Sequence, residues 1–119
     1  MSTPFHILVV DDEPALLRLM RAFLERVGYS IDVAATATEG LNAVAKDPAR
    51  YKVIIADLTL PDMQGDQMAL RMIELNPEAR ILLCSGYVFE LESLPLRFRD
   101  RFAILQKPFV PAMLTSAIE

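Results

Sequence analysis

Short apolar runs alternate along the chain with longer segments in which apolar residues recur at helical spacing. The short runs are rich in β-branched residues and carry few polar side chains, which is typical of strands buried on both faces of a sheet. They cover residues 6–10, 29–35, 53–57, 80–84 and 102–106. This pattern predicts five strands.

Four amphipathic segments predict helices, and they cover residues 14–27, 36–47, 66–75 and 110–119. Gly28 is suited to end the first of these helices. Thr36 and Glu39 have the spacing of a capping box at the start of the second. The apolar stripes of the first three helices end in residues that we expect to face the core, namely Val27, Ala45 and Leu75.

The segment between the fourth and fifth runs, residues 87–101, has the weakest pattern. Residues 89–94 predict a little over one turn of helix, which Pro95 interrupts. The charged residues that follow predict a solvated loop, and they are Arg97, Arg99, Asp100 and Arg101.

Strands that alternate with helices predict an α/β domain with a parallel sheet and helices on both faces. The 119 residues suffice for one domain, so we expect a single domain over residues 1–119. The last predicted helix stops within about three turns, as in a domain cut from a longer chain.

Composition narrows the class of protein. The net charge is −4 and no basic block occurs, which argues against direct binding of nucleic acid. No apolar run approaches the roughly 20 residues that cross a bilayer, so no membrane contact is expected. The one cysteine, Cys84, lies inside an apolar run and fits a reducing compartment, so we expect a cytoplasmic protein.

Polar residues follow four of the five predicted strands at their carboxyl ends. They are Asp11 with Asp12, then Asp57, Ser85 and Lys107. The carboxyl ends of parallel strands share one edge of the sheet, and ligands bind at that edge in open α/β sheets. We therefore expect these side chains to meet in one site.

Converging carboxylates are costly. Two of them about 4 Å apart repel by about 4 kcal/mol at an effective dielectric of 20, and three cost on the order of 10 kcal/mol. That is comparable with the stability of a whole domain. The fold tolerates three only through protonation, wider spacing or a bound cation, and an oxygen-only site suits Mg²⁺ or Mn²⁺.

The neighbouring polar groups extend this chemistry. The ammonium of Lys107 and the hydroxyl of Ser85 are suited to phosphoryl oxygens. Asp57 is then the candidate nucleophile, which forms an acyl phosphate.

Four blocks of the chain together resemble the signature of bacterial response-regulator receiver domains. They are VVDDE at residues 9–13, IADLTLPDMQG at 55–65, LCSGY at 83–87 and QKPF at 106–109. They span nearly the whole chain in the family's order. The last two blocks are most similar to receivers attached to hybrid sensor kinases.

The resemblance implies a flavodoxin-like, doubly wound five-stranded sheet with strand order 2-1-3-4-5. It implies a two-component phosphorelay in which Asp57 accepts phosphate from a histidine kinase or phosphotransfer domain. Phosphorylation would then change the surface around the fourth and fifth strands, which an effector would bind. The sequence does not identify that effector. Asp12 would bind Mg²⁺ directly, and Asp11 would bind it through a water molecule. The main-chain carbonyl of Thr59 would be a further ligand. Ser85 and Lys107 would hold the phosphoryl group, and the Lys107–Pro108 peptide bond would be cis.

One position departs from the family pattern. Receivers usually carry Phe or Tyr three residues before the lysine, whereas this chain has Ile104. The nearest aromatic is Phe102, which we place on the opposite face of the strand. The departure keeps open a phosphorylation-independent docking module as an alternative function.

An aspartate-nucleophile phosphatase of the haloacid dehalogenase type is the other alternative, and it would be an enzyme. That class uses a second Asp two residues after the nucleophile, where this chain has Thr59, and the chain has no room for a cap domain. We expect a signalling phosphoacceptor rather than an enzyme.

Overall fold

Five parallel strands form one sheet in the order β2-β1-β3-β4-β5. A computed structural model describes residues 6–86 and 94–118. The elements are β1 (His6–Val10), α1 (Pro14–Arg26), β2 (Ser30–Ala34), α2 (Ala37–Lys46), β3 (Tyr51–Asp57), α3 (Gly65–Leu75), β4 (Arg80–Ser85), η2 (Leu96–Arg101), β5 (Phe102–Gln106) and α4 (Pro111–Ile118). The predicted fold class and strand order are confirmed.

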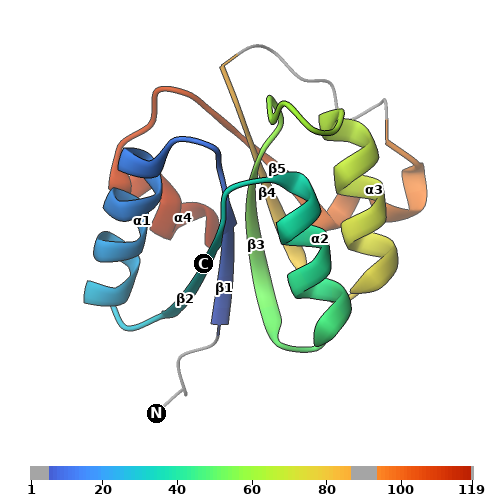
Figure 1. Ribbon diagram of the computed structural model, residues 1–119, viewed down its shortest axis with the longest axis horizontal. Coiled ribbons are helices and arrows are strands. Elements are labelled where there is room, and N and C mark those ends of the chain that lie inside the picture. Colours follow the sequence, from blue (N-terminus) through green and yellow to red (C-terminus); the bar gives the residue numbers. More distant parts are fainter. Residues whose placement is uncertain (1–5, 87–93, 119) are drawn as a thin grey trace.

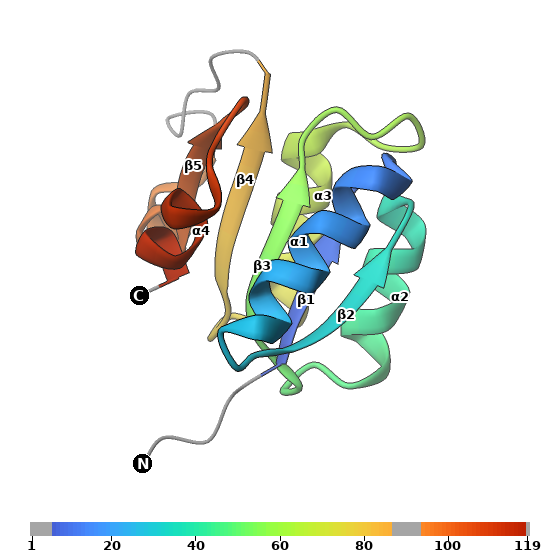
Figure 2. The ribbon, with the colours of Figure 1, turned by 90° about the vertical axis from the view of Figure 1, so that its left-hand side faces the viewer.

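Helices cover both faces of the sheet, α2 and α3 on one side and α1 and α4 on the other (Figures 1 and 2). Alternate residues of one strand therefore enter different cores. In β1, Leu8 and Val10 pack beneath α2 and α3, whereas Ile7 and Val9 pack beneath α1 and α4. This double burial explains why the strands are continuous apolar runs.

The helix ends largely follow the predicted signals. Gly28 adopts a positive φ of 108° just after α1, where its missing Cβ removes the steric penalty. The Thr36 hydroxyl accepts a hydrogen bond from the Glu39 N–H at 3.0 Å, as the capping box predicts. The Glu39 carboxylate, however, accepts from the N–H of Ala35 rather than from that of Thr36.

Three residues that we expected to be buried are exposed. Val27, Ala45 and Leu75 each lie in or just after the last turn of their helix. Helical periodicity marks the apolar face of a helix, but it does not show how far the sheet extends beneath that face. The buried positions lie earlier in each helix, for example Leu24 in α1 and Ile73 in α3.

The segment before β5 is more ordered than predicted. Residues expected as a solvated loop form the 3₁₀-helix η2 (Leu96–Arg101). The Arg99 side chain donates a hydrogen bond from Nε to the carbonyl of Leu94 at 2.9 Å. The short helical turn predicted for residues 89–94 falls mostly on residues 87–93, outside the described part of the chain.

The placement of Phe102 relative to Ile104 was wrong. Both side chains pack against the core beneath α2 and α3, whereas Ala103 and Leu105 pack on the other face. Residues two apart in a strand share a face, so this result is what the strand period requires.

Candidate functional site

The carboxyl ends of the strands lie at one edge of the sheet (Figure 2), and the polar residues found there converge on one another. β1 lies beside β3, and β4 separates β3 from β5. This order places Asp11, which follows β1, next to Asp57 at the end of β3. Lys107 follows β5 and reaches across β4 to both carboxylates.

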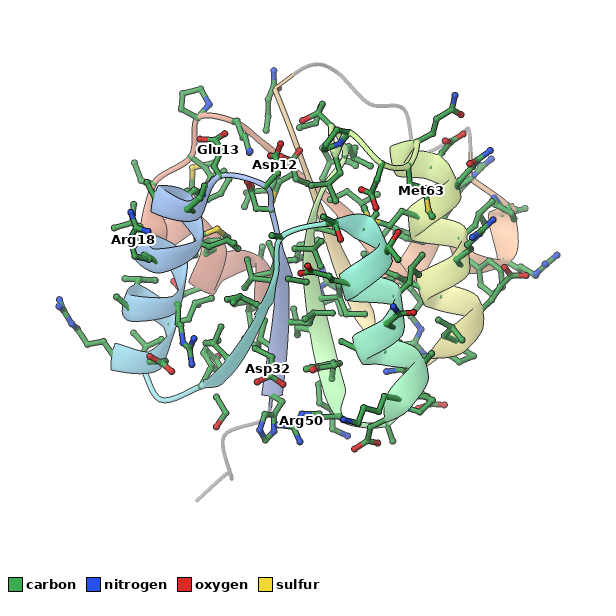
Figure 3. All side chains as sticks on the ribbon, in the orientation of Figure 1. Asp12, Glu13, Arg18, Asp32, Arg50 and Met63 are labelled. Carbon is green, nitrogen blue, oxygen red and sulfur yellow. The ribbon has the colours of Figure 1, made fainter. Side chains whose placement is uncertain are left out.

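Three acids form the centre of the site. Asp11, Asp12 and Asp57 each present a carboxylate oxygen, and these oxygens lie within 4.8 Å of one another. Asp11 and Asp57 are buried, whereas Asp12 is exposed at the end of the molecule (Figure 3). Of the three acids, Asp12 is therefore the one that solvent reaches.

Lys107 forms an ion pair with two of these carboxylates. Its Nζ lies 3.2 Å from Asp11 Oδ2 and 3.2 Å from Asp57 Oδ2, and 3.9 Å from Glu13 Oε1. Burial alone would lower the pKa of Lys107, but the hydrogen bonds and charges of Asp11 and Asp57 outweigh burial and raise it. The lysine is therefore a fixed cation at neutral pH.

The ion pair between Lys107 and Asp11 is not symmetric. The pKa of Asp11 is also raised, because burial outweighs the hydrogen bond that its Oδ1 accepts from the Glu13 N–H at 2.9 Å and the attraction of Lys107. Asp57 adds repulsion in the same direction. Asp11 thus carries an electrostatic cost that additional positive charge would relieve.

The two oxygens of Asp57 have different partners. Oδ1 accepts hydrogen bonds from the Thr59 N–H at 2.9 Å and from the Thr59 hydroxyl at 2.8 Å. Oδ2 accepts from Lys107. These contacts hold the carboxylate plane in one orientation, which a nucleophile requires.

Backbone bonds join the ends of β3, β4 and β5. The Lys107 N–H donates to the Ser85 carbonyl at 2.7 Å, and the Leu58 N–H donates to the Cys84 carbonyl at 2.9 Å. Ser85 is fully buried at the end of β4. The peptide bond between Lys107 and Pro108 is cis, as the resemblance implied.

The donor set suits a divalent cation that prefers oxygen. Three carboxylates supply only oxygen ligands, which favours hard ions over zinc. The nearby Cys84 thiol does not compete, because burial raises its pKa to about 12 and keeps it protonated. An acidic pocket of this kind fits a bound divalent ion.

The sequence analysis did not predict two clusters of hydrogen-bonded polar side chains. The Asp62 carboxylate accepts hydrogen bonds from the N–H groups of Ala37 and Thr38 at the start of α2. Arg50 and Tyr51 both donate hydrogen bonds to Asp32, at the opposite end of the molecule from Asp12 (Figure 3). These hydrogen bonds join residues 18 to 25 positions apart in the chain, so no local pattern could have revealed them.

None of the helices in the described ranges is long and apolar enough to span a membrane.

Comparison with known proteins gives one consistent result. The protein-family model of the response regulator receiver domain matches residues 7–119 of this chain. The transcriptional regulatory protein GlrR of Escherichia coli (strain K12) is 28% identical over 98% of this chain, which spans only 26% of that protein. The chemotaxis protein CheY of Thermotoga maritima is 27% identical over 94% of this chain and 92% of its own length.

Solved structures agree with the sequence matches. A receiver domain protein (CheY-like) from Methanospirillum hungatei JF-1 superposes with a TM-score of 0.83 at 30% identity, covering 97% of this chain and 90% of that one. A receiver domain protein from Clostridium thermocellum also gives a TM-score of 0.83, at 26% identity, covering 96% and 90%.

Proposed function

The chain belongs to the response regulator receiver domain family, and on that premise we propose that Asp57 is its phosphoacceptor. Receiver domains act in two-component systems, in response regulators and in hybrid kinases. The donor proposed for this chain is the phosphohistidine of a histidine kinase or of a phosphotransfer domain. The whole chain, residues 1–119, would act as a single receiver domain in the cytoplasm.

The observation that carries the proposal is the position of Lys107. Its ammonium lies 3.2 Å from both Asp11 and Asp57, which are buried. A buried pair of this kind is weak evidence for stability, because desolvation offsets much of the attraction. A fixed cation beside a nucleophilic carboxylate is, by contrast, useful where negative charge must arrive and be held.

The proposed reaction transfers one phosphoryl group. An oxygen of the Asp57 carboxylate attacks phosphorus, and the bond between phosphorus and the donor's imidazole nitrogen breaks. The electron pair of that bond stays on the imidazole nitrogen, which takes a proton. The product is an acyl phosphate on Asp57, which carries more negative charge than the original carboxylate.

The side chains around Asp57 have distinct proposed roles. We expect the ammonium of Lys107 to bind one phosphoryl oxygen, because the phosphoryl group adds negative charge. We expect the Ser85 hydroxyl to bind another phosphoryl oxygen. Thr59 holds Asp57 Oδ1 through its N–H and hydroxyl before the reaction. The movement of Ser85 and Lys107 toward the phosphoryl group would change the surface around β4 and β5.

Asp11, Asp12, Asp57 and the main-chain carbonyl of Thr59 are the proposed ligands of Mg²⁺ or Mn²⁺. The raised pKa of Asp11 supports this assignment, because a nearby dication would favour the charged carboxylate. When bound, such an ion neutralises charge on the phosphoryl oxygens. Asp12 would be the accessible ligand, since it is the exposed member of the cluster.

The test uses acetyl phosphate as a small donor, with and without Mg²⁺. We expect the intact mass to rise by one phosphoryl group in the presence of Mg²⁺, and the adduct to be stable to acid and labile to base. The Asp57→Asn variant should acquire none. Asp47→Asn removes the same charge at the far end of α2 and should be phosphorylated like the wild type.

Two results would lead to other functions. An equal adduct on the wild type and Asp57→Asn would remove Asp57 as the acceptor. Turnover of a phosphomonoester would instead indicate an aspartate-nucleophile phosphatase. If the phosphorylated wild type, the unphosphorylated wild type and Asp57→Asn all bind a phosphotransfer partner equally, the domain acts as a docking module. The presence of Ile104 in place of the usual aromatic is the reason for this measurement.

A further inference from the structure

Asp62 joins the connection between β3 and α3 to the start of α2. Its Oδ1 accepts a hydrogen bond from the Ala37 N–H at 3.0 Å, and its Oδ2 accepts from the Thr38 N–H at 3.0 Å. Oδ2 also accepts from the Thr38 hydroxyl at 2.8 Å. One carboxylate thus receives three hydrogen bonds from a segment 24 and 25 residues earlier in the chain.

These bonds complete the first turn of α2. The first N–H groups of a helix have no partner within the helix. In α2 the Thr36 hydroxyl takes the N–H of Glu39, and Asp62 takes those of Ala37 and Thr38. A carboxylate at this end of a helix is also favoured by the helix dipole.

The charge state of Asp62 fits this role. The hydrogen bonds from the Thr38 and Ala37 N–H groups hold the pKa of Asp62 below its usual value. The carboxylate is therefore ionised at neutral pH and forms charge-assisted hydrogen bonds, which are the stronger kind.

The connection that Asp62 belongs to also carries Thr59. At its start, the N–H and hydroxyl of Thr59 bond to Asp57 Oδ1. Leu58 and Leu60 are buried, and at its end Gly65 lies against Leu58 so closely that an added Cβ would be 2.7 Å from the Leu58 carbonyl oxygen. Between these anchors the exposed Asp62 makes the polar link to α2.

We propose that Asp62 is a positioning residue for the phosphoacceptor site. By tying the connection after β3 to the start of α2, it holds Thr59 where its N–H and hydroxyl meet Asp57 Oδ1. The same residue, Thr59, carries the main-chain carbonyl that the proposed function counts among the ligands of a divalent ion. The inference rests on the proposed function, since it assigns Asp62 a part in the same site.

The first test removes the carboxylate. In Asp62→Ala we expect the acetyl phosphate reaction to slow by about threefold to tenfold, because small displacements of a positioned group lower rates strongly. The Mg²⁺ concentration that gives half the maximal rate should rise by about threefold or more. A role confined to the stability of α2 would leave that Mg²⁺ concentration unchanged.

The second measurement does not depend on phosphorylation. The Thr59 amide resonance in NMR spectra reports its hydrogen bond to Asp57, and it should shift in Asp62→Ala together with those of Ala37 and Thr38. An unchanged Thr59 amide, or a wild-type rate and Mg²⁺ dependence in a folded Asp62→Ala, would overturn the proposal. A wild type that takes no phosphate would defeat the proposed function, while the Thr59 resonance would still decide the positioning role.

Graded variants separate positioning from a loss of folding. Thr38→Val keeps the shape of the side chain and removes only the hydroxyl donor, so it should shift the Thr59 amide in the same direction by a smaller amount. Asp62→Asn keeps one acceptor oxygen and should lie between the wild type and Asp62→Ala. Asp47→Asn serves as the charge-matched control and should leave the Thr59 amide and the Mg²⁺ dependence unchanged.

Discussion

Lys107 pairs with two buried carboxylates, Asp11 and Asp57, through contacts of equal length. Within the described residues, Asp12 belongs to the same cluster but makes no ion pair. The protein therefore keeps an excess of negative charge at this edge of the sheet. Without a bound cation, this excess of like charge destabilises the folded state, and a bound cation relieves the repulsion. The acidic residues at this edge therefore contribute to function at some cost in stability.

Replacing Asp12 by Asn should make this cost measurable. In the presence of a chelator, we expect Asp12→Asn to raise the free energy of unfolding by about 1 kcal/mol, the size of the repulsion between solvated charges about 4 Å apart. The midpoint of thermal unfolding should rise by about 4 °C. Added Mg²⁺ should stabilise the wild type and have little effect on the variant, and a variant less stable than the wild type in chelator would contradict the repulsion.

The element that decides the geometry of the site is the connection between β3 and α3. It begins at Asp57 and ends at Gly65, the first residue of α3. Hydrogen bonds and buried leucines hold it at several points, so it is a rigid support and not a free loop. The close approach of Gly65 to Leu58 joins the start of α3 to the residue that follows Asp57.

Gly65→Ala tests this close approach. A Cβ at residue 65 would lie 2.5 Å from Leu58 Cδ2, 2.7 Å from the Leu58 carbonyl oxygen and 2.9 Å from Leu58 Cα. Two of these atoms belong to the backbone, so a change of rotamer cannot relieve the contact. We expect a loss of about 2 kcal/mol in the free energy of unfolding by chemical denaturation.

Gly86 offers the control for this prediction. An added Cβ there meets nothing within 4 Å, so Gly86→Ala should be much less destabilising. Equal losses in the two variants would show that the contact with Leu58 is not the cause.

At the scale of the whole molecule, two clusters of charged side chains lie at opposite ends of the sheet. Asp12 and Glu13 lie at one end, and Asp32 and Arg50 lie at the other (Figure 3). In the second cluster, the Tyr51 hydroxyl donates to Asp32 at 2.7 Å and Arg50 Nε donates to the same oxygen at 3.0 Å. Because β1 lies between β2 and β3, these bonds link strands that are not neighbours.

Tyr51→Phe should separate stability from chemistry. Burial, together with the hydrogen bond to Asp32, raises the pKa of Tyr51 to about 12. A raised pKa means that the stability contributed by the phenol is fully present below pH 10 and is lost as the pH rises toward 12. We expect Tyr51→Phe to lose about 1 kcal/mol of stability at neutral pH.

The measurements for this variant are denaturant unfolding, the tyrosinate absorbance and the phosphorylation rate. The wild type should show a tyrosinate absorbance step near pH 12 that Tyr51→Phe lacks. The acetyl phosphate reaction should proceed at the wild-type rate, because the cluster lies at the end of the molecule opposite Asp12. A slower reaction would contradict the independence of the two ends.

The sequence by itself determined the five strands, the fold class and the residues at the carboxyl ends of the strands. Burial on both faces makes each strand a continuous apolar run, and the polar residue that ends such a run stands out. The parallel order then brings Asp11, Asp57 and Lys107 to one edge, as predicted.

Only the tertiary structure decided which groups bond across that edge and how the edge is supported. The bonds from Asp62 to α2 and from Tyr51 to Asp32 join residues distant in the chain, and such bonds leave no periodic pattern. The limits of the core at Val27, Ala45 and Leu75 likewise depend on where the sheet stops beneath each helix. Local chemistry specifies elements and their ends, whereas contacts between elements depend on distances that arise only when the chain is packed.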